Sequence, residues 1–328
     1  MRPFSLVKST LRRQFIQWIA VAALFAPLSV QAADPLKEIR IDWATYNPVS
    51  LVLKDQKLLE KEFEKDGIAI RWVQSAGSNK ALEFLSAGSL DIGSTAGAAA
   101  LISKINGNPI KSIYVFSRPE WTALVTKSDD IKTVADLKGK RVAVTRGTDP
   151  HIFLVRTLAG AGLTEKDVKL VLLQHADGRT ALERGDVEAW AGLDPIMASA
   201  EVESGARLFY RKAADNTWGI LNVREDFARD YPDVIKRVLA TYEKARLWSL
   251  ANPKELSKSL VEATKLSEAV IAKQLERTEL THGPIGATQA DTIIGAGLAL
   301  QDAGVVKTDV DIKAVVKGLI DSSYLPAK

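Results

Sequence analysis

The fold of this chain is indicated most directly by the stretch LDIGSTAG at residues 90–97. Residues 90–93 have the apolar pattern of a short strand, and the small or hydroxyl-bearing residues 94–97 lead from it into an apolar helix. The same succession of strand, turn and helix recurs on both sides, over residues 39–63 and 141–162. Such alternation is typical of a mostly parallel sheet covered by helices, so the sequence predicts an α/β fold.

The alternation starts twice, which predicts two lobes rather than one. A first series ends with a strand at residues 110–116, a second begins with a strand at 122–127, and the chain turns helical after a last strand at 218–223. A chain of 328 residues is long enough for two separate cores. We predict the following units: lobe 1, residues 33–121 and 219–328 with a helical C-terminal tail; lobe 2, residues 122–218; and a two-segment hinge near residues 117–121 and 216–219.

Residues 1–32 have the three parts of a secretory signal peptide. A basic start with four Lys and Arg side chains precedes an apolar run at residues 15–30, and Val30-Gln31-Ala32 offers small residues for cleavage after Ala32. Polar residues and a proline interrupt the run, which favours cleavage over a membrane anchor. We predict a soluble, periplasmic mature protein. The arginine pair leaves both Sec and twin-arginine export open.

Composition excludes several classes of protein. The chain has no cysteine, so disulfides, thiolate catalysis and iron–sulfur clusters are ruled out. The four cations of the leader account for the whole excess of 44 basic over 40 acidic residues, and no basic stripe follows. We therefore predict no binding to nucleic acid.

The turns between strands and helices are the candidate binding sites. Ligands of open α/β sheets sit beyond the carboxyl ends of the strands, where helix N-termini present unpaired N–H groups and a partial positive charge. These turns can therefore hold an anion without a full cation. Capping of the helix is the alternative role of their Ser and Thr residues. The candidates are Tyr46, Asn47, Ser75, Gly77, Ser94, Thr95, Gly147 and Thr148.

Five further residues complete the predicted ligand site. Trp121 and Trp218 fall at the expected crossings between lobes, and Trp190 lies in a strand; the three can form an aromatic wall, with core packing as the alternative. His151 lies in the first turn of a predicted cleft helix, and Asp194 precedes Pro195 as a helix cap. Asp149 is also expected as an N-cap, and the sequence leaves open whether it faces the ligand.

The sequence predicts neither an enzyme nor a cofactor or metal site. The three histidines are too scattered for a zinc motif such as H-E-x-x-H. The chain contains no G-x-S-x-G, Walker A or G-x-G-x-x-G pattern. A site that only binds remains the simplest interpretation.

Four stretches resemble periplasmic aliphatic-sulfonate-binding proteins: residues 90–95, 131–143, 147–158 and 185–195. The resemblance runs through nearly the whole mature chain in order. It implies the type II periplasmic-binding-protein fold, which nitrate, taurine and thiamine-precursor binders share. It also implies that two lobes close over a ligand and deliver it to the membrane subunits and ATPase of an ABC importer.

We therefore predict a monomeric solute-binding component that captures a small organic anion, most simply an aliphatic sulfonate. Taurine, a sulfate ester, nitrate or a thiamine-precursor-like solute are alternative ligands. A periplasmic ligand sensor is an alternative role.

Overall fold

The computed structural model describes residues 35–325 and contains two mixed sheets. The expected signal peptide and its cleavage point lie outside the described residues. The first sheet is six-stranded, in the order β11 (Thr278–Glu279), β4 (Ile110–Pro119), β10 (Gly219–Arg224), β3 (Ile92–Ala96), β1 (Glu38–Trp43) and β2 (Ala69–Gln74). The second is five-stranded, in the order β7 (Lys169–Leu172), β6 (Arg141–Val144), β8 (Ala189–Ala191), β5 (Leu124–Thr126) and β9 (Arg207–Tyr210).

Each sheet is parallel on one side and antiparallel on the other, so the expectation of mostly parallel sheets holds only in part. β1 pairs parallel with β2 and β3, and β6 pairs parallel with β7 and β8. β10 and β5 run antiparallel to both of their neighbours. These two strands follow the two connections between the sheets, and each enters its sheet from the opposite direction.

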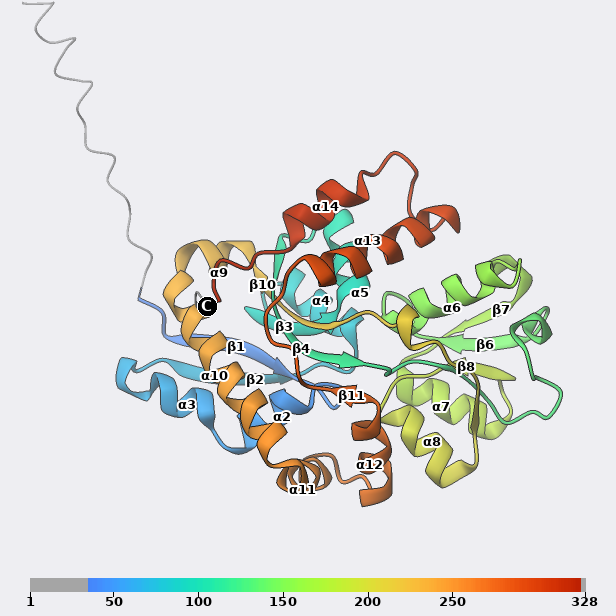
Figure 1. The fold of residues 1–328 in the computed structure, drawn as a ribbon, viewed down its shortest axis with the longest axis horizontal. Coiled ribbons are helices and arrows are strands. Elements are labelled where there is room, and N and C mark those ends of the chain that lie inside the picture. Colours follow the sequence, from blue (N-terminus) through green and yellow to red (C-terminus); the bar gives the residue numbers. More distant parts are fainter. Residues whose placement is uncertain (1–34, 326–328) are drawn as a thin grey trace, which may run out of the picture. The chain divides into compact units, whose positions relative to one another are not determined.

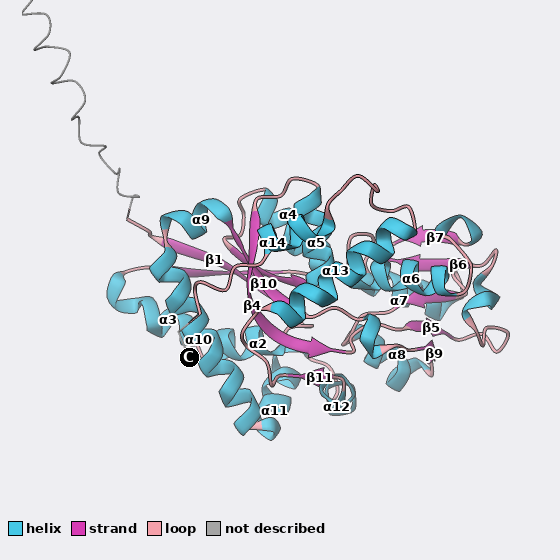
Figure 2. Ribbon diagram, turned by 45° about the horizontal axis from the view of Figure 1, so that its top comes forward, coloured by secondary structure: helices cyan, strands magenta, loops and turns pink. Residues whose placement is uncertain are grey.

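Helices cover both sheets (Figures 1 and 2). Those between the strands of the first sheet are α2 (Pro48–Asp55), α3 (Leu58–Phe63), α4 (Ser78–Ser86) and α5 (Gly97–Ile105). Those of the second sheet are α6 (Asp149–Gly160), α7 (His175–Arg184) and α8 (Ile196–Ser204). Short 3-10 helices at Glu64–Asp66, Val134–Leu137, Glu165–Asp167 and Ala213–Asp215 complete these connections.

The last third of the chain is helical, as expected. After α9 (Glu225–Asp230) come α10 (Pro232–Ala251), α11 (Pro253–Thr264), α12 (Glu268–Glu276), α13 (Ala287–Asp302) and α14 (Ile312–Leu319). Proline at the first position of α10 and α11 fixes where these helices begin. In Figure 1 these orange and red helices lie around the first sheet, with α12 near α8 and α13 near α6.

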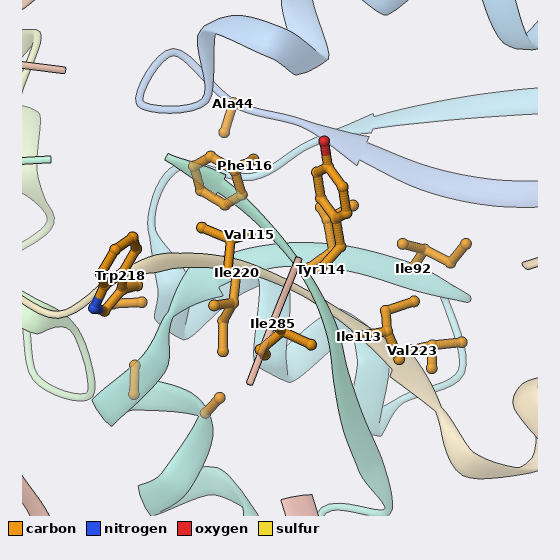
Figure 3. Packing of buried hydrophobic residues seen from close by; sticks show 14 of the residues in the cluster. Ala44, Ile92, Ile113, Tyr114, Val115, Phe116, Trp218, Ile220, Val223 and Ile285 are labelled. Atoms are coloured by element: carbon orange, nitrogen blue, oxygen red, sulfur yellow. The ribbon is translucent and has the colours of Figure 1, made fainter. Parts of the chain in front are cut away.

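The apolar cores follow the two sheets. The largest cluster packs around β3, β4 and β10, where Ile92, Tyr114, Phe116 and Ile220 are at most 1% exposed (Figure 3). Two smaller clusters lie on the two faces of the second sheet, around Phe153 and around Trp190. The first cluster also takes in Ile152 of α6, so apolar packing continues from one sheet's helices to the other's. Within residues 35–325, no helix combines the length and apolar character needed to cross a membrane.

Candidate functional site

The turns that precede α4, α6 and α7 meet at one place between the two sheets. A Cβ atom added to Gly77, before α4, would lie 3.0 Å from His175 Nε2 at the start of α7. A Cβ atom added to Gly147, before α6, would lie 3.8 Å from the Cβ of Asn79. One helix of the first sheet and two of the second therefore direct their N-termini toward a common point.

These three helix ends have no side-chain cap. Gly77 has no side chain to offer, and the Thr148 hydroxyl donates instead to Thr145 O, at 2.6 Å. Gln174, which precedes α7, makes no capping hydrogen bond either. The backbone N–H groups of Ser78 and His175, each at the first position of its helix, have no partner within the described chain. Unpaired donors at positive helix ends are what an oxyanion needs.

The N-termini of α2 and α5 differ because the protein itself satisfies them. Asn47 Oδ1 accepts a hydrogen bond from Ser50 N at 3.2 Å and so caps α2. At α5, Gly97 N donates to Trp218 O at 3.0 Å, and Ala98 N donates to Thr217 Oγ1 at 3.2 Å. Of the predicted turns, those before α4 and α6 are therefore free, and those before α2 and α5 are bonded within the protein.

Ser94 and Thr95 lie in β3 rather than in a turn, and both are fully buried. Ser94 donates from its backbone N and its hydroxyl to the two carboxylate oxygens of Asp42, at 2.9 and 2.8 Å. Thr95 Oγ1 donates to Ala96 O and accepts from Asn222 Nδ2 at 2.7 Å. Burial raises the pKa of Asp42 to about 7, and a carboxylate here disfavours a nearby anion.

Tyr46 and Ser75 are likewise part of the first lobe's packing. The Tyr46 hydroxyl donates to Ser94 O at 2.9 Å, and its ring meets Trp121 edge to face. Asn47 also donates to the Tyr242 hydroxyl at 3.1 Å. Ser75 is 2% exposed and lies just past β2, where its backbone N donates to Trp43 O at the end of β1.

Asp149 links the two chain segments that connect the sheets, one at Trp121 and the other at Thr217. Its carboxylate accepts hydrogen bonds from Trp121 Nε1 at 2.8 Å and from the backbone N and hydroxyl of Thr217 at 2.9 and 2.7 Å. Asp149 is the first residue of α6, after the N-cap Thr148, so the expectation that it is the N-cap was wrong. Burial raises its pKa, and the three donors oppose that shift. The carboxylate therefore faces the crossing segments and is fully occupied there.

Two of the tryptophans are packed against other side chains of the protein. Trp218 is 6% exposed and packs edge to face against His282, with Arg118 5.4 Å from its ring centre. Trp190 is fully buried in the second lobe's core, against Gly178 of α7. These placements give Trp190 the contacts of a core residue.

Asp194 forms an ion pair and His151 forms a hydrogen bond with other side chains of the protein. Asp194 lies 3.0 Å from Arg277 Nε and accepts from Ala198 N at 2.9 Å. Burial raises its pKa to about 7, although Arg277 opposes the shift. His151 Nε2 lies 2.9 Å from Glu165 Oε1. Helix α8 begins at Ile196, after a cis Asp194–Pro195 peptide bond.

His175 is the residue at the meeting point that the sequence did not single out. It is 1% exposed, and burial lowers its pKa to about 3. Its place in the chain could have indicated it. His175 is the first residue of the helix after β7, just as Asp149 is the first residue of the helix after the neighbouring strand β6. Because the turn at Gln174 lacks glycine, serine and threonine, composition alone did not mark it. The described chain holds no group of three or more His, Cys, Asp or Glu side chains arranged for a metal ion.

Comparison with known proteins places these features in a family. A family model described as "NMT1/THI5 like" matches residues 62–256. A protein of Escherichia coli K12, provisionally named an aliphatic sulfonates-binding protein, is 31% identical over 83% of this chain and 86% of its own length.

Solved structures share the fold. The periplasmic aliphatic sulphonate binding protein SsuA of Escherichia coli has a TM-score of 0.72 at 28% identity, over 86% of this chain and 98% of that one. The alkanesulfonate-binding protein SsuA of Xanthomonas axonopodis pv. citri, bound to MOPS, has a TM-score of 0.80 at 24% identity, over 89% and 100%. The desulfurization enzyme DSZB shares the fold at 13% identity, with a TM-score of 0.63, over 88% and 97%. This chain belongs to the NMT1/THI5-like family and, within it, to the aliphatic-sulfonate-binding proteins.

Proposed function

We propose that this protein is the periplasmic solute-binding component of an ABC importer and captures an alkanesulfonate between its lobes. One observation carries the proposal: the uncapped N-termini of α4, α6 and α7, from both sheets, meet at Gly77, Gly147 and His175. Because donors from both lobes contact the same anion, its binding favours the closed arrangement.

A sulfonate suits this arrangement for two reasons. Its three oxygens can accept hydrogen bonds from several helix ends at once, and the partial positive charge of those helix ends favours its single negative charge. Arg146, which follows β6, is half-exposed and lies 3.9 Å from Glu165, so it remains paired at the surface. The relative from Xanthomonas is described as bound to MOPS, which carries an alkanesulfonate group.

We also propose that the protein is exported to the periplasm and acts there as a monomer with a hinge between its lobes. The leader at residues 1–32 supports export to the periplasm, with cleavage after Ala32. The connections through Trp121 and Thr217 serve as the hinge between lobe 1 (residues 33–121 and 219–328) and lobe 2 (residues 122–218). A monomer that closes in this way presents its closed form to the membrane subunits of the importer.

We also propose that the bound sulfonate is released unchanged. The family relatives are named for binding, whereas the neighbour named as an enzyme shares only the fold. Incubating the protein with ethanesulfonate and assaying inorganic sulfite tests this directly. Release of sulfite in proportion to time and protein concentration contradicts a pure binding function.

The ligand is tested by thermal unfolding of the mature protein in phosphate-free Tris buffer, because common sulfonate buffers compete for the site. The panel contains ethanesulfonate, butanesulfonate, taurine, ethyl sulfate, nitrate and a hydroxymethylpyrimidine. At 100 times its dissociation constant, a true ligand stabilises the protein by about 2.7 kcal/mol. We expect the alkanesulfonates to raise the melting temperature most. Stabilisation by the pyrimidine or nitrate alone contradicts the proposal.

A further inference from the structure

The imidazole of His175 has one nitrogen with a clear partner and one without. Its Nδ1 lies 3.2 Å from Thr145 Oγ1, and that hydroxyl donates its hydrogen to Leu173 O at 2.7 Å. Because the Thr145 hydrogen is already used, Thr145 Oγ1 accepts, and Nδ1 carries the ring hydrogen. Nε2 is therefore an unprotonated acceptor, and it has no hydrogen-bond partner within the part of the chain that the structure describes.

The unpaired nitrogen points at the meeting point of the helix ends. Nε2 lies 3.0 Å from the position of a Cβ atom on Gly77, at the N-terminus of α4, and His175 is itself the first residue of α7. Both helix ends contribute partial positive charge. A protonated imidazole at this place would be buried beside two positive helix ends, so the neutral ring is favoured.

No neighbouring charge offsets this. On α4, Lys80 and Glu83 pair with each other at the surface. Beside the turn before α6, Arg146 and His151 both lie near Glu165. On α7 itself, Asp177 is exposed, and Arg179 pairs with Glu183 and Glu203. Burial alone accounts for the lowered pKa of His175.

An oxyanion at the same place reverses the balance. A negative charge near Nε2 favours the protonated ring, and a charge-assisted hydrogen bond then forms between Nε2–H and the anion. We propose that His175 takes up one proton from solvent when an alkanesulfonate binds, and that Nε2–H then donates to a sulfonate oxygen. This inference rests on the proposed function and adds that capture is linked to a proton.

The linkage has a definite sign. The sulfonate stays ionised throughout the working range, so only the protein titrates. When the bound form holds the proton more tightly than the free form, affinity increases as pH falls, by up to about tenfold per pH unit between the two pKa values. The complex of one anion and one imidazolium has no net charge, which suits a buried site.

The experiment is isothermal titration of the mature protein with ethanesulfonate at pH 8, 7 and 6, in two sulfonate-free buffers with different ionisation enthalpies. The dependence of the measured heat on the buffer gives the number of protons taken up. Three proteins are compared: wild type, His175→Gln and, as a matched control, His282→Gln, which changes a half-exposed histidine. Glutamine keeps an amide donor at position 175 but cannot titrate.

For the wild type and His282→Gln we expect uptake of up to one proton, with an affinity that increases about tenfold or more from pH 8 to pH 6. For His175→Gln we expect binding without proton uptake and an affinity that changes less than about twofold over this range. Tight wild-type binding without proton uptake overturns the inference and leaves the proposed function intact. Equal proton uptake by His175→Gln also overturns it. Failure of ethanesulfonate to bind the wild type at every pH contradicts the proposed function itself.

Discussion

The N-termini of α4, α6 and α7 and those of α2 and α5 occupy similar places along the chain and differ in how their N–H groups are bonded. All five follow a strand or a turn beyond one, which is where an α/β protein binds its ligand. At α2 and α5 the first N–H groups are bonded to Asn47, Thr217 and Trp218. At the other three helices the first N–H groups, those of Ser78, Asp149 and His175, have no partner within the described chain. We infer that a turn is available for binding when the protein leaves the backbone N–H groups of the following helix without hydrogen-bond partners.

The largest effect is expected at Asp42, the buried carboxylate that accepts hydrogen bonds from Ser94 shortly before α5. Burial raises the pKa of Asp42 to about 7, so the folded state binds a proton that the unfolded state releases near pH 4. The free energy of unfolding contributed by this group therefore falls as pH rises from about 4 to about 7, by at most about 1.4 kcal/mol per pH unit. We expect Asp42→Asn to lack this contribution.

Urea unfolding of both proteins at several pH values between 4 and 8 measures it. The stability difference, variant minus wild type, should increase with pH and level off above about pH 7. A difference that is constant across the range contradicts the assignment of a raised pKa to Asp42.

The second test targets the N-terminus of α5 by removing Asp149, which holds the Thr217 side chain that caps this helix. Asp149 accepts three hydrogen bonds, and one of its donors, the Thr217 hydroxyl, is also the cap of α5. We expect Asp149→Ala to lower the free energy of unfolding by about 3 kcal/mol, because three buried donors lose a charged partner. Chemical unfolding measures this, with the exposed Asp129→Ala as the matched control. Equal stability of the two variants contradicts this role.

The third test blocks access of a ligand to the free N-terminus of α4. In Gly77→Val, side-chain atoms occupy the space beside His175 Nε2 and Asn79 Oδ1, which lie 3.0 and 2.9 Å from the Cβ position. We expect affinity for ethanesulfonate to fall about 100-fold, since charge-assisted hydrogen bonds to one helix end are lost. Gly295→Ala is the control, because a Cβ atom there meets nothing within 4 Å. Unchanged affinity in Gly77→Val removes α4 from the site.

The smallest effect is expected at Thr95. Its hydroxyl accepts from Asn222 and donates to Ala96 O inside the sheet. Thr95→Val should therefore lower stability by about 1–2 kcal/mol and leave sulfonate affinity unchanged. Thr308→Val, at an exposed position, should change neither quantity. Weakened binding with normal stability in Thr95→Val would place this residue at the ligand after all.

Much of the fold could be predicted from local pattern. The helical C-terminal part was predicted correctly, and Pro232 and Pro253 mark the starts of two of its helices. Strand β9 was missed, since its four residues are only half-buried and carry no clear alternation. The antiparallel placement of β5 and β10 was missed as well, because the direction in which a strand enters a sheet is a property of the whole chain.

The site was less predictable because capping comes from far along the chain. Gly147 and Gly77 were recognised by composition, and the structure brings their turns together. Nothing near Gly97 in sequence reveals that Thr217 and Trp218 satisfy its helix. His175 went unnoticed for the opposite reason: its turn has no small residues, and its importance lies in an unpaired nitrogen.

We infer that the free N-termini of α4, α6 and α7 hold the anion, and that the occupied N-termini of α2 and α5 do not. A crystal structure of the protein with ethanesulfonate tests it most directly. We expect sulfonate oxygens within about 3 Å of the Ser78 N–H and His175 Nε2, beside the turn at Gly147. A sulfonate bound against the N-terminus of α2 or α5, or away from His175, would contradict it.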